Sequence, residues 1–307
     1  MIDLAALGSL RAVAARGSVV AAAEELGYTP SAVSQQLKRL ERQAGLPLLE
    51  RVGRGVVLTA HGRHLAEEGG RLLADLEDLE ATLRRRSGVV AGTVRLTAFS
   101  TAVRGLVAPV VRDLHARHPD LAIAVREREP WDAVEEIAAG RCDLALVHRW
   151  GDVPLAVPDH VSVTPVALDE AEVIVPRGHR LAGRERITTH DLVEEEWIAT
   201  PPGTICRQWL GRMYDGTGRT PRVAHEAQEF ASHLALVRAG LGIALIPRLG
   251  REPLDADLSA VTVVDPSPTR AVDALHRRSM AGSPAVMRVL EELVAAAAAQ
   301  NSADARF

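Results

Sequence analysis

Three short helical patterns, each stopped by a glycine, occupy the first 45 residues and constrain the fold of this chain more than any other feature. Apolar residues recur at helical spacing over residues 4–15 and again over residues 19–26. Gly17, Gly27 and Gly45 follow the three patterns, and glycine readily ends a helix in the left-handed conformation. Two short helices joined by a tight glycine turn predict a helix-turn-helix.

The third pattern begins at Thr29 and Pro30, which suit the N-cap and first turn of a helix that runs to about residue 44. Its apolar face, predicted to pack inward, holds Val33, Leu37, Leu40 and Ala44. Its polar face combines hydroxyls, an amide and cations, on Ser31, Ser34, Gln35, Lys38 and Arg42. Hydroxyls allow close approach to bases, an amide bonds a base edge and cations reach phosphates, so this face is typical of a major-groove reader. A solvated helix face is the open alternative.

A positively charged wing is predicted next to these helices. Residues 51–59 read as two short strands around glycines, and Arg51 and Arg54 would reach a nucleic-acid backbone. Residues 1–63 carry 8 basic and 5 acidic side chains, a net charge of +3, whereas the whole chain carries −4. A positive head on a negative body favours a polyanionic partner at one end only.

A long helix is predicted from Thr59, which can cap it, to about residue 86. Its apolar positions form one narrow seam: Leu65, Gly69, Leu72, Leu76, Leu79 and Leu83. This spacing, about 3.5 residues, predicts a coiled coil in which the five leucines join two chains. A helix buried within one chain would show the same leucines, but the charged residues elsewhere on this helix favour a partner helix.

The rest of the chain alternates between strand and helix patterns. Three strands (94–97, 122–126 and 143–147) alternate with two helices (102–116 and 131–139). A second alternating set follows at 171–176, 187–192, 197–199, 206–213, 223–226, 231–239 and 243–246, before a closing alanine-rich helix at 285–299. The pattern predicts two α/β lobes with parallel strands, and a crevice at the carboxyl ends of those strands.

Two predicted helix starts would face this crevice. Ser100 and Thr101 open one helix, and Gly203 and Thr204 precede another that begins near Cys206. Helix N-termini favour anions, so this arrangement predicts a small carboxylate effector, with simple N-caps as the open alternative. Further cleft candidates lie just past strand ends and suit an apolar group beside the carboxylate: Trp131, His148, Trp150, Glu226 and Phe230.

Enzyme and metal motifs are absent from the sequence. Lys38 is the only lysine, and neither a phosphate-binding Gly-Lys-Ser/Thr loop nor a Gly-x-Ser-x-Gly motif occurs. The two cysteines, Cys142 and Cys206, form no C-x-x-C pair, and the histidines lack ligand spacing. We therefore expect no catalytic residue, no metal and no cofactor. Without an apolar run of membrane-spanning length or an export signal, we expect a cytoplasmic protein that does not enter a membrane.

At its N-terminus the sequence resembles the LysR-type transcriptional regulators. The matching residues are Gly17-Ser-Val-Val-Ala-Ala-Ala-Glu-Glu-Leu26, Thr29-Pro-Ser-Ala-Val-Ser-Gln-Gln-Leu-Lys-Arg-Leu-Glu41, Gly45, Leu48, Leu49, Glu50-Arg51, Arg54-Gly55, Leu58-Thr59 and Gly62. Leu49 departs from the phenylalanine usual in the family, which is an apolar exchange. The body matches more weakly, at residues 140–146 and 237–247.

The resemblance implies a winged helix-turn-helix domain at 1–60, a linker and dimerisation helix with its junction at 61–91, and an effector-binding domain at 92–300, followed by a tail at 301–307. The effector domain would have the α/β fold of type 2 periplasmic-binding proteins. Its first lobe would comprise 92–164 and 267–300, and its second lobe 165–266. In this family the linker helix pairs two subunits, and the positions of Ser100, Thr101 and Thr204 serve the effector.

The function that follows is DNA-binding transcriptional regulation modulated by a small, anionic effector, without enzymatic activity. Ser31, Ser34 and Gln35 would contact bases; phosphate contacts and the helix start would involve Ser18, Thr29, Pro30, Lys38, Arg51 and Arg54. The partners would be a pseudo-palindromic operator in double-stranded DNA, a second copy or three further copies of the chain, and RNA polymerase if the protein activates.

Two alternatives remain. One is a small-molecule-binding protein whose N-terminal head dimerises without binding DNA. The other is a redox-sensing regulator that uses Cys206, because a helix N-terminus stabilises a thiolate.

Overall fold

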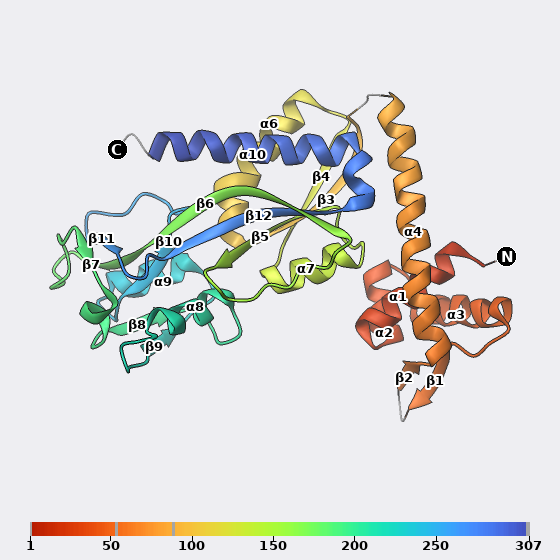
Figure 1. Ribbon diagram of the computed structural model, residues 1–307, viewed down its shortest axis with the longest axis horizontal. Coiled ribbons are helices and arrows are strands. Elements are labelled where there is room, and N and C mark those ends of the chain that lie inside the picture. The colour runs from red at the N-terminus through yellow and green to blue at the C-terminus, as the bar shows by residue number, and fades with distance from the viewer. Residues whose placement is uncertain (1, 53–54, 88–89, 305–307) are drawn as a thin grey trace. The chain divides into compact units, whose positions relative to one another are not determined.

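The computed structural model describes residues 2–52, 55–87 and 90–304 (Figure 1). The chain divides into two compact units after Ser87, and each is described by itself.

The N-terminal unit is built on three helices that begin and end where the sequence predicts. They are α1 (Leu4–Arg16), α2 (Val19–Leu26) and α3 (Pro30–Ala44). The side chains of Asp3, Ser18 and Thr29 accept backbone N–H groups at the three N-termini, and Gly17, Gly27 and Gly45 take left-handed conformations at the C-termini. Ala6, Leu10, Val13, Ala22, Val33, Leu37 and Leu40 are fully or almost fully buried in one shared core. This confirms the helix-turn-helix formed by α2 and α3.

The wing is joined closely to α3. Strands β1 (Leu49–Val52) and β2 (Gly55–Leu58) pair antiparallel. The carboxylate of Glu41 on α3 accepts the backbone N–H groups of Leu48 and Leu49, at 2.9 and 3.1 Å. The helix α4 (Ala60–Ser87) follows, and Thr59 caps it by accepting the N–H of Gly62. Helix and wing are therefore held to each other by partly buried hydrogen bonds.

One mixed sheet organises the C-terminal unit, in the order β4-β3-β5-β12-β6-β11-β7, with β10 also paired to β6. Strands β3 (Gly92–Ala98), β4 (Leu121–Glu127) and β5 (Leu144–Trp150) are parallel, as predicted. The remaining strands of the sheet are β6 (Val161–Pro176), β7 (Arg186–Ile187), β10 (Ala244–Pro247), β11 (Leu258–Val263) and β12 (Thr269–Arg277).

Helices cover both faces of this sheet (Figure 1). On one face a continuous helical segment consists of α5 (Ser100–Ala102), the π-turn η1 (Val103–Val107) and α6 (Ala108–Arg117), and it packs with α10 (Pro284–Asp304). On the other face, α7 (Pro130–Ala138) packs against β5 and β12. A single 3-10 turn, η3 (Arg278–Gly282), connects β12 to α10.

The second half of the unit has its own core, with the two-stranded parallel sheet of β8 (Glu196–Ala199) and β9 (Arg222–Glu226). The helices α8 (Ile205–Met213) and α9 (Phe230–Arg238) pack here. Trp197 is fully buried in this core and donates to Tyr214. A smaller cluster, Trp150, Val153, Ala171, Ile205 and Trp209, joins the two halves.

Three features of the sheet differ from the sequence-based expectation. Strand β6 begins ten residues before the predicted 171–176, and neither β11 nor β12 was predicted. The predicted element at 187–192 is a two-residue strand followed by the 3-10 turn η2 (Thr189–Leu192). Residues 161–170 of β6 pair with β12, and residues 171–176 pair with β10 and β11. One strand thus crosses the lobe boundary expected at 164/165.

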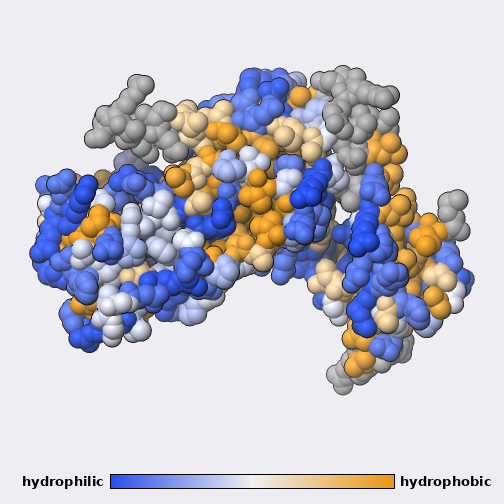
Figure 2. Space-filling view, in the orientation of Figure 1, coloured by the Kyte–Doolittle hydropathy of each residue, from blue (hydrophilic) through white to orange (hydrophobic). Residues whose placement is uncertain are grey.

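For β6 the reason for the miss is visible in the exposure of its side chains, whereas the mostly buried β12 was missed because charged residues such as Arg270 and Asp273 interrupt its apolar run. The first half of β6 alternates between buried and exposed side chains, and Val163 and Leu168 face solvent. Apolar surface is correspondingly gathered over the centre of the C-terminal unit, where β6 and β12 lie (Figure 2). Such half-exposed antiparallel strands lack the continuous apolar run of the buried parallel strands.

A substitution at Gly62 tests how closely the start of the wing packs against α4. A Cβ atom at this position would lie 2.1 Å from the carbonyl oxygen of Leu48, so Gly62→Ala must push the wing away from α4. We expect a loss of about 1–3 kcal/mol in the free energy of unfolding, measured by urea titration. Gly8→Ala is the control, because its Cβ meets nothing within 4 Å, and it should stabilise α1 by about 0.5–1 kcal/mol. Equal effects of the two variants would contradict the close seating.

Candidate nucleic-acid interface and ligand cleft

Helix α3 has the two faces that the sequence predicts. Val33, Leu37 and Leu40 are buried, although Ala44 is only half-buried at the last turn. Ser31, Gln35, Lys38 and Arg42 are exposed, and Ser34 is half-buried. The polar face is therefore presented outside the unit's core.

Some side chains on this face already form hydrogen bonds within the protein, and others do not. Ser34 donates to the carbonyl of Pro30 at 2.8 Å, and the hydroxyl of Thr29 accepts the N–H of Ala32. By contrast, among the residues the structure describes, the side chains of Gln35 and Lys38 have no hydrogen-bond or ion-pair partner. The amide of Gln35 and the ammonium of Lys38 therefore keep all their hydrogen-bonding groups available to an external partner.

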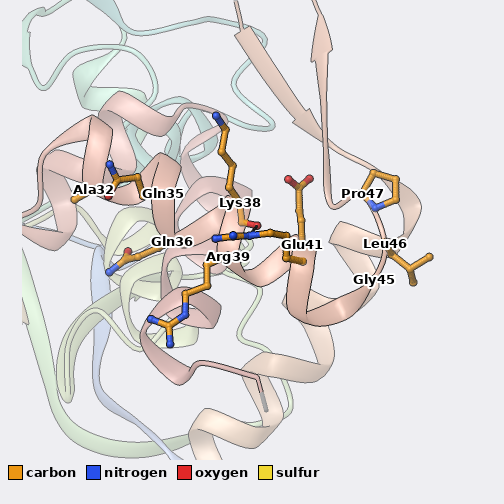
Figure 3. Close-up of a pocket in the computed structure, with 10 residues that line it drawn as sticks. Ala32, Gln35, Gln36, Lys38, Arg39, Glu41, Gly45, Leu46 and Pro47 are labelled. Carbon is orange, nitrogen blue, oxygen red and sulfur yellow. Dashed lines mark hydrogen bonds between the residues drawn. The ribbon is translucent and has the colours of Figure 1, made fainter.

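A groove of about 1100 Å³ runs beside this face, between α3 and the approach to the wing (Figure 3). It is lined by Gln35, Lys38 and Arg42, and also by Gln36 and Arg39, which the sequence analysis did not assign. Gln36 accepts a hydrogen bond from the buried hydroxyl of Ser9 at 2.6 Å, which fixes its orientation. Arg39 lies one helical turn from Gln35, and this spacing was the signal available in the sequence.

Of four other predicted contact residues, Ser18 and Pro30 are placed in full and Arg51 in part. Ser18 accepts the N–H groups of Val20 and Ala21 as the cap of α2. Arg51 lies in β1, paired with Val56, but its side chain and the whole of Arg54 fall outside the described residues. Pro30 occupies the exposed first turn of α3.

The leucines predicted to form the seam of α4 differ in exposure: some face solvent, whereas Leu65 packs within its own unit. The side chains of Leu72 and Leu79 are 50% and 56% exposed, and Leu76 is half-buried. Leu65 instead packs against the core of its own unit, and a Cβ on Gly69 would meet Leu7 at 2.4 Å. Leu65 is thus partly covered within its own unit, because the first turns of α4 pack on α1, and its part in pairing two chains stays a prediction. The side chain of Leu83 lies outside the described residues.

In the C-terminal unit a buried arginine stands beside the first predicted helix start. Arg270 on β12 is 1% exposed and donates to Asp169 at 2.8 Å and to the hydroxyl of Thr101 at 2.7 Å. Asp169 also accepts the N–H of Leu249 at 2.9 Å. The guanidinium lies 5.0 Å from the ring centroid of Phe99. Ser100, the other predicted residue, is half-buried.

His148 and Trp150 lie on one face of β5, next to Arg270, and both are almost fully buried. The ring of His148 packs edge-on against Phe99 at 4.6 Å. Burial, with the nearby charge of Arg270 as a smaller cause, holds the pKa of His148 well below its usual value, so the imidazole is neutral. Trp150 stacks on Trp209 of α8 at 5.7 Å.

The second predicted helix start is already engaged within the protein. Thr204 caps α8 by accepting the N–H of Arg207, and its hydroxyl also bonds Thr200 and the carbonyl of Pro201. Gly203 before it has a positive φ of 90°. The simple N-cap, left open by the sequence, therefore describes the hydroxyl of Thr204.

The other three predicted cleft residues differ in how much of each side chain is buried. Trp131 is half-buried and donates to the carbonyl of Pro154. Glu226 is exposed and pairs with Arg207 at 3.0 Å. Phe230 is buried at the start of α9.

At the place of the expected crevice between the two halves, the structure has a small cavity of about 20 Å³. Its lining includes Trp150, Thr200, Cys206, Phe230 and His233. The two halves of the unit also meet through Arg104 and Glu229 at 3.6 Å and through Gln228 and Glu129 at 3.1 Å. The crevice was expected from the order of the strands. Large aromatic side chains and these polar contacts occupy that space instead.

The thiols do not have the character of redox sensors. Both cysteines are free, and burial raises the pKa of Cys142 and of Cys206 to about 11. Cys206 keeps part of its surface exposed, yet its thiol is packed among buried groups, and the charge of Arg270 offsets this burial only in part. Reaction requires the thiolate, so the geometry disfavours the redox alternative.

Alkylation by iodoacetamide tests this. At pH 8 the folded protein should react about 100-fold more slowly at Cys206 than the urea-unfolded chain, whose thiols titrate near pH 8.5. Because the raised pKa leaves the thiol protonated, the folded-state rate should rise about tenfold per pH unit until pH approaches 11. Mass spectrometry of the labelled peptides provides the rates. A rate at pH 7 equal to that of a free thiol would restore the redox alternative.

The described residues contain neither a cluster of metal-ligating side chains nor a membrane-spanning helix. Within residues 2–52, 55–87 and 90–304, no group of three or more potential ligand side chains could hold a metal ion. None of the helices in these segments is both long enough and apolar enough to cross a membrane.

Comparison with known proteins matches both units. Residues 4–63 match the family model described as bacterial regulatory helix-turn-helix protein, lysR family, and residues 87–298 match the LysR substrate binding domain. The HTH-type transcriptional regulator TtuA of Agrobacterium vitis is 30% identical over 231 residues, 74% of each chain. The RuBisCO operon transcriptional regulator of Allochromatium vinosum is 30% identical over 247 residues, 80% of this chain and 79% of its own.

Solved structures share the fold over nearly the whole chain. A full-length OxyR variant from Pseudomonas aeruginosa has a TM-score of 0.69 at 18% identity, covering 97% of this chain and 95% of its own. Full-length BenM has a TM-score of 0.59 at 23% identity, covering 98% of both chains. Full-length CbnR, solved with its target DNA, has a TM-score of 0.53 at 22% identity and covers 96% of this chain and 100% of its own.

Proposed function

Because the chain belongs to the LysR family of DNA-binding transcriptional regulators, we propose that the exposed face of α3 reads an operator and that a ligand bound between the two halves of the C-terminal unit controls this reading. The observation that carries the proposal is the pair Gln35 and Lys38, exposed on α3 and without partners among the described residues. The comparisons support regulation of transcription in place of catalysis, because the relatives are named as regulators.

In this proposal Gln35, with Ser31 and Ser34, contacts base edges. Lys38 contacts phosphate at the far end of the same face, and Ser18, Thr29, Pro30, Arg51 and Arg54 lie around the backbone. An amide makes paired hydrogen bonds to adenine in the major groove, whereas an ammonium recognises any phosphate. The two side chains should therefore differ in what their loss does.

Gln35→Ala should weaken binding to the specific operator by about 10-fold or more while leaving binding to random DNA nearly unchanged. Lys38→Ala should weaken both and lower the salt slope by about 1. Fluorescence anisotropy with the DNA upstream of the protein's own gene, at several salt concentrations, measures both effects. Arg177→Ala, in the C-terminal unit, is the charge-matched control for Lys38. An equal loss on specific and random DNA for Gln35→Ala would count against base reading.

Two copies of the chain, or four, would bind a pseudo-palindromic operator, with α4 as the pairing helix. Leu72 and Leu79 leave large apolar side chains in solvent, and burying them against a second helix would be favourable by roughly 1.5–3 kcal/mol each. An activator would in addition contact RNA polymerase.

The double substitution of Leu72 and Leu79 by Ala should shift the protein toward monomer in sedimentation velocity at micromolar concentration. Leu241→Ala is the matched control, since Leu241 is also an exposed leucine but lies after α9. If the double variant sediments as the wild-type protein does, α4 is not the pairing helix.

The effector would be a small carboxylate bound near Thr101 and Arg270. Two of the three guanidinium nitrogens of Arg270 are bonded, Nε to Asp169 and Nη2 to Asp169 and Thr101. Its N–H groups and the helix start at Thr101 both favour an anion. Binding would change the angle between the two halves of the unit, and so shift the population of DNA-reading states. The rival, a binding protein whose head only dimerises, predicts a low salt slope in the anisotropy experiment.

A further inference from the structure

The exposed face of α3 carries an arginine that is paired with a carboxylate at the start of α1. Arg39 lies one helical turn after Gln35 and lines the same groove (Figure 3). Its side chain is 61% exposed, and its Nη1 atom lies 3.3 Å from Oδ2 of Asp3. An ion pair this exposed contributes little to stability, so stability alone does not explain why a carboxylate lies beside the groove.

Asp3 is held in place independently of Arg39. Its Oδ1 atom caps α1 by accepting the N–H groups of Ala5 and Ala6, at 3.0 and 3.3 Å. Its own N–H donates to Oε1 of Gln43 on α3, at 3.1 Å. One carboxylate oxygen thus caps a helix while the other faces Arg39 from a fixed position. A carboxylate that is itself fixed restricts the orientations of the guanidinium paired with it.

Helix α1 holds the same side of α3 at a second point. The buried hydroxyl of Ser9 donates to Oε1 of Gln36, at 2.6 Å. Gln36, Arg39 and Gln43 are three and four residues apart, so they share one side of the helix. The two helices are therefore joined before and after Arg39, which keeps Arg39 and Asp3 beside each other.

The ion pair changes what Arg39 can recognise. A negative charge next to an arginine weakens its attraction to phosphate but leaves its N–H groups directional. A planar guanidinium has five N–H donors, so an arginine paired through Nη1 can still offer Nε and Nη2 together to two acceptors. In the major groove guanine presents two acceptors, N7 and O6, whereas adenine presents one acceptor beside a donor and cytosine presents a donor. A restrained arginine on this face therefore suits guanine.

We propose, resting on the operator reading of the proposed function, that Arg39 reads one guanine in each half-site and that Asp3 orients it. Arg39 contacts the base, and Asp3 is a positioning residue that acts through Arg39. Gln35 and Arg39, one helical turn apart, then specify two base pairs of different type, an adenine and a guanine.

The test uses the full chain and the operator fragment, in which each guanine is replaced in turn by 7-deazaguanine, which has carbon in place of N7. Affinities are measured by fluorescence anisotropy. The wild-type protein should lose about 10-fold in affinity at one guanine of each half-site. Arg39→Lys keeps the charge but not the planar pair of donors, so its loss at that guanine should be about twofold or less. Arg71→Lys, at an ion-paired arginine of α4, is the control and should retain the full loss.

Asp3→Asn separates orientation from charge. Asparagine still caps a helix N-terminus but carries no charge, and urea titration shows whether the variant folds. Random DNA should be bound as tightly as by the wild-type protein, or up to about threefold more tightly, because a charge that repels phosphate is gone. The loss at the sensitive guanine should fall to about threefold, since the guanidinium is no longer restrained. Tighter binding to all DNA with the full guanine effect retained would overturn the positioning role.

The outcomes separate this inference from the proposed function. If no guanine is sensitive in the wild-type protein while Gln35→Ala still lowers operator binding, the guanine contact is wrong and operator reading stands. Full guanine sensitivity in Arg39→Lys would also overturn the inference. If the wild-type protein binds operator and random DNA equally, the proposed function fails and the guanine contact fails with it. Reduced guanine sensitivity in both Arg39→Lys and Asp3→Asn, with binding to random DNA retained, would support the inference.

Discussion

The ion pair between Arg270 and Asp169 holds together the part of the molecule in which a ligand would act. Both side chains are almost entirely buried, and their partners lie on four different segments: β12, β6, the helix start at Thr101 and the backbone at Leu249. Removing two charges from water is costly, so such a pair persists only where hydrogen bonds satisfy most of its remaining atoms. Losing one partner would leave an unpaired charge at about 3–5 kcal/mol.

This pair also explains the neutral character of its surroundings. The charge of Arg270 is balanced by Asp169, and it contributes to keeping His148 uncharged. The aromatic rings of Phe99 and Trp150 cover the guanidinium. The result is a buried site in which the charge of the guanidinium is paired with a carboxylate and covered by aromatic rings.

The N-terminal unit was predictable because its signals are local. Caps, glycine stops and 3.6-residue periodicity are each read from a few neighbouring residues. Ser18 and Thr29 cap helix N-termini, and Gly45 ends α3, as their residue types predict. The partial burial of Leu65 could not be predicted, because a leucine at a seam position has the same spacing whether it packs within its own unit or on another chain. Only the tertiary contact with the core distinguishes the two.

The ligand cleft was less predictable because its chemistry comes from residues far apart in sequence. Arg270 meets Thr101 across 169 positions, and β12, which carries Arg270, has no strong strand pattern. His233 appeared among scattered histidines without any motif. His148, Trp150 and Phe230 were identified from positions just past predicted strand ends, although His148 and Trp150 in fact lie within β5. Their burial depends on contacts between the two halves, which no local pattern encodes.

The attachment of the wing also constrains α3. Glu41 is the one carboxylate of α3, and its oxygen is occupied by the backbone of Leu48 and Leu49. A negative charge that would repel a nucleic acid is thereby used to join helix to wing. The two elements are joined by these bonds, so under the proposed function a shift of the wing on the sugar-phosphate chain would also change which base edges the helix reaches.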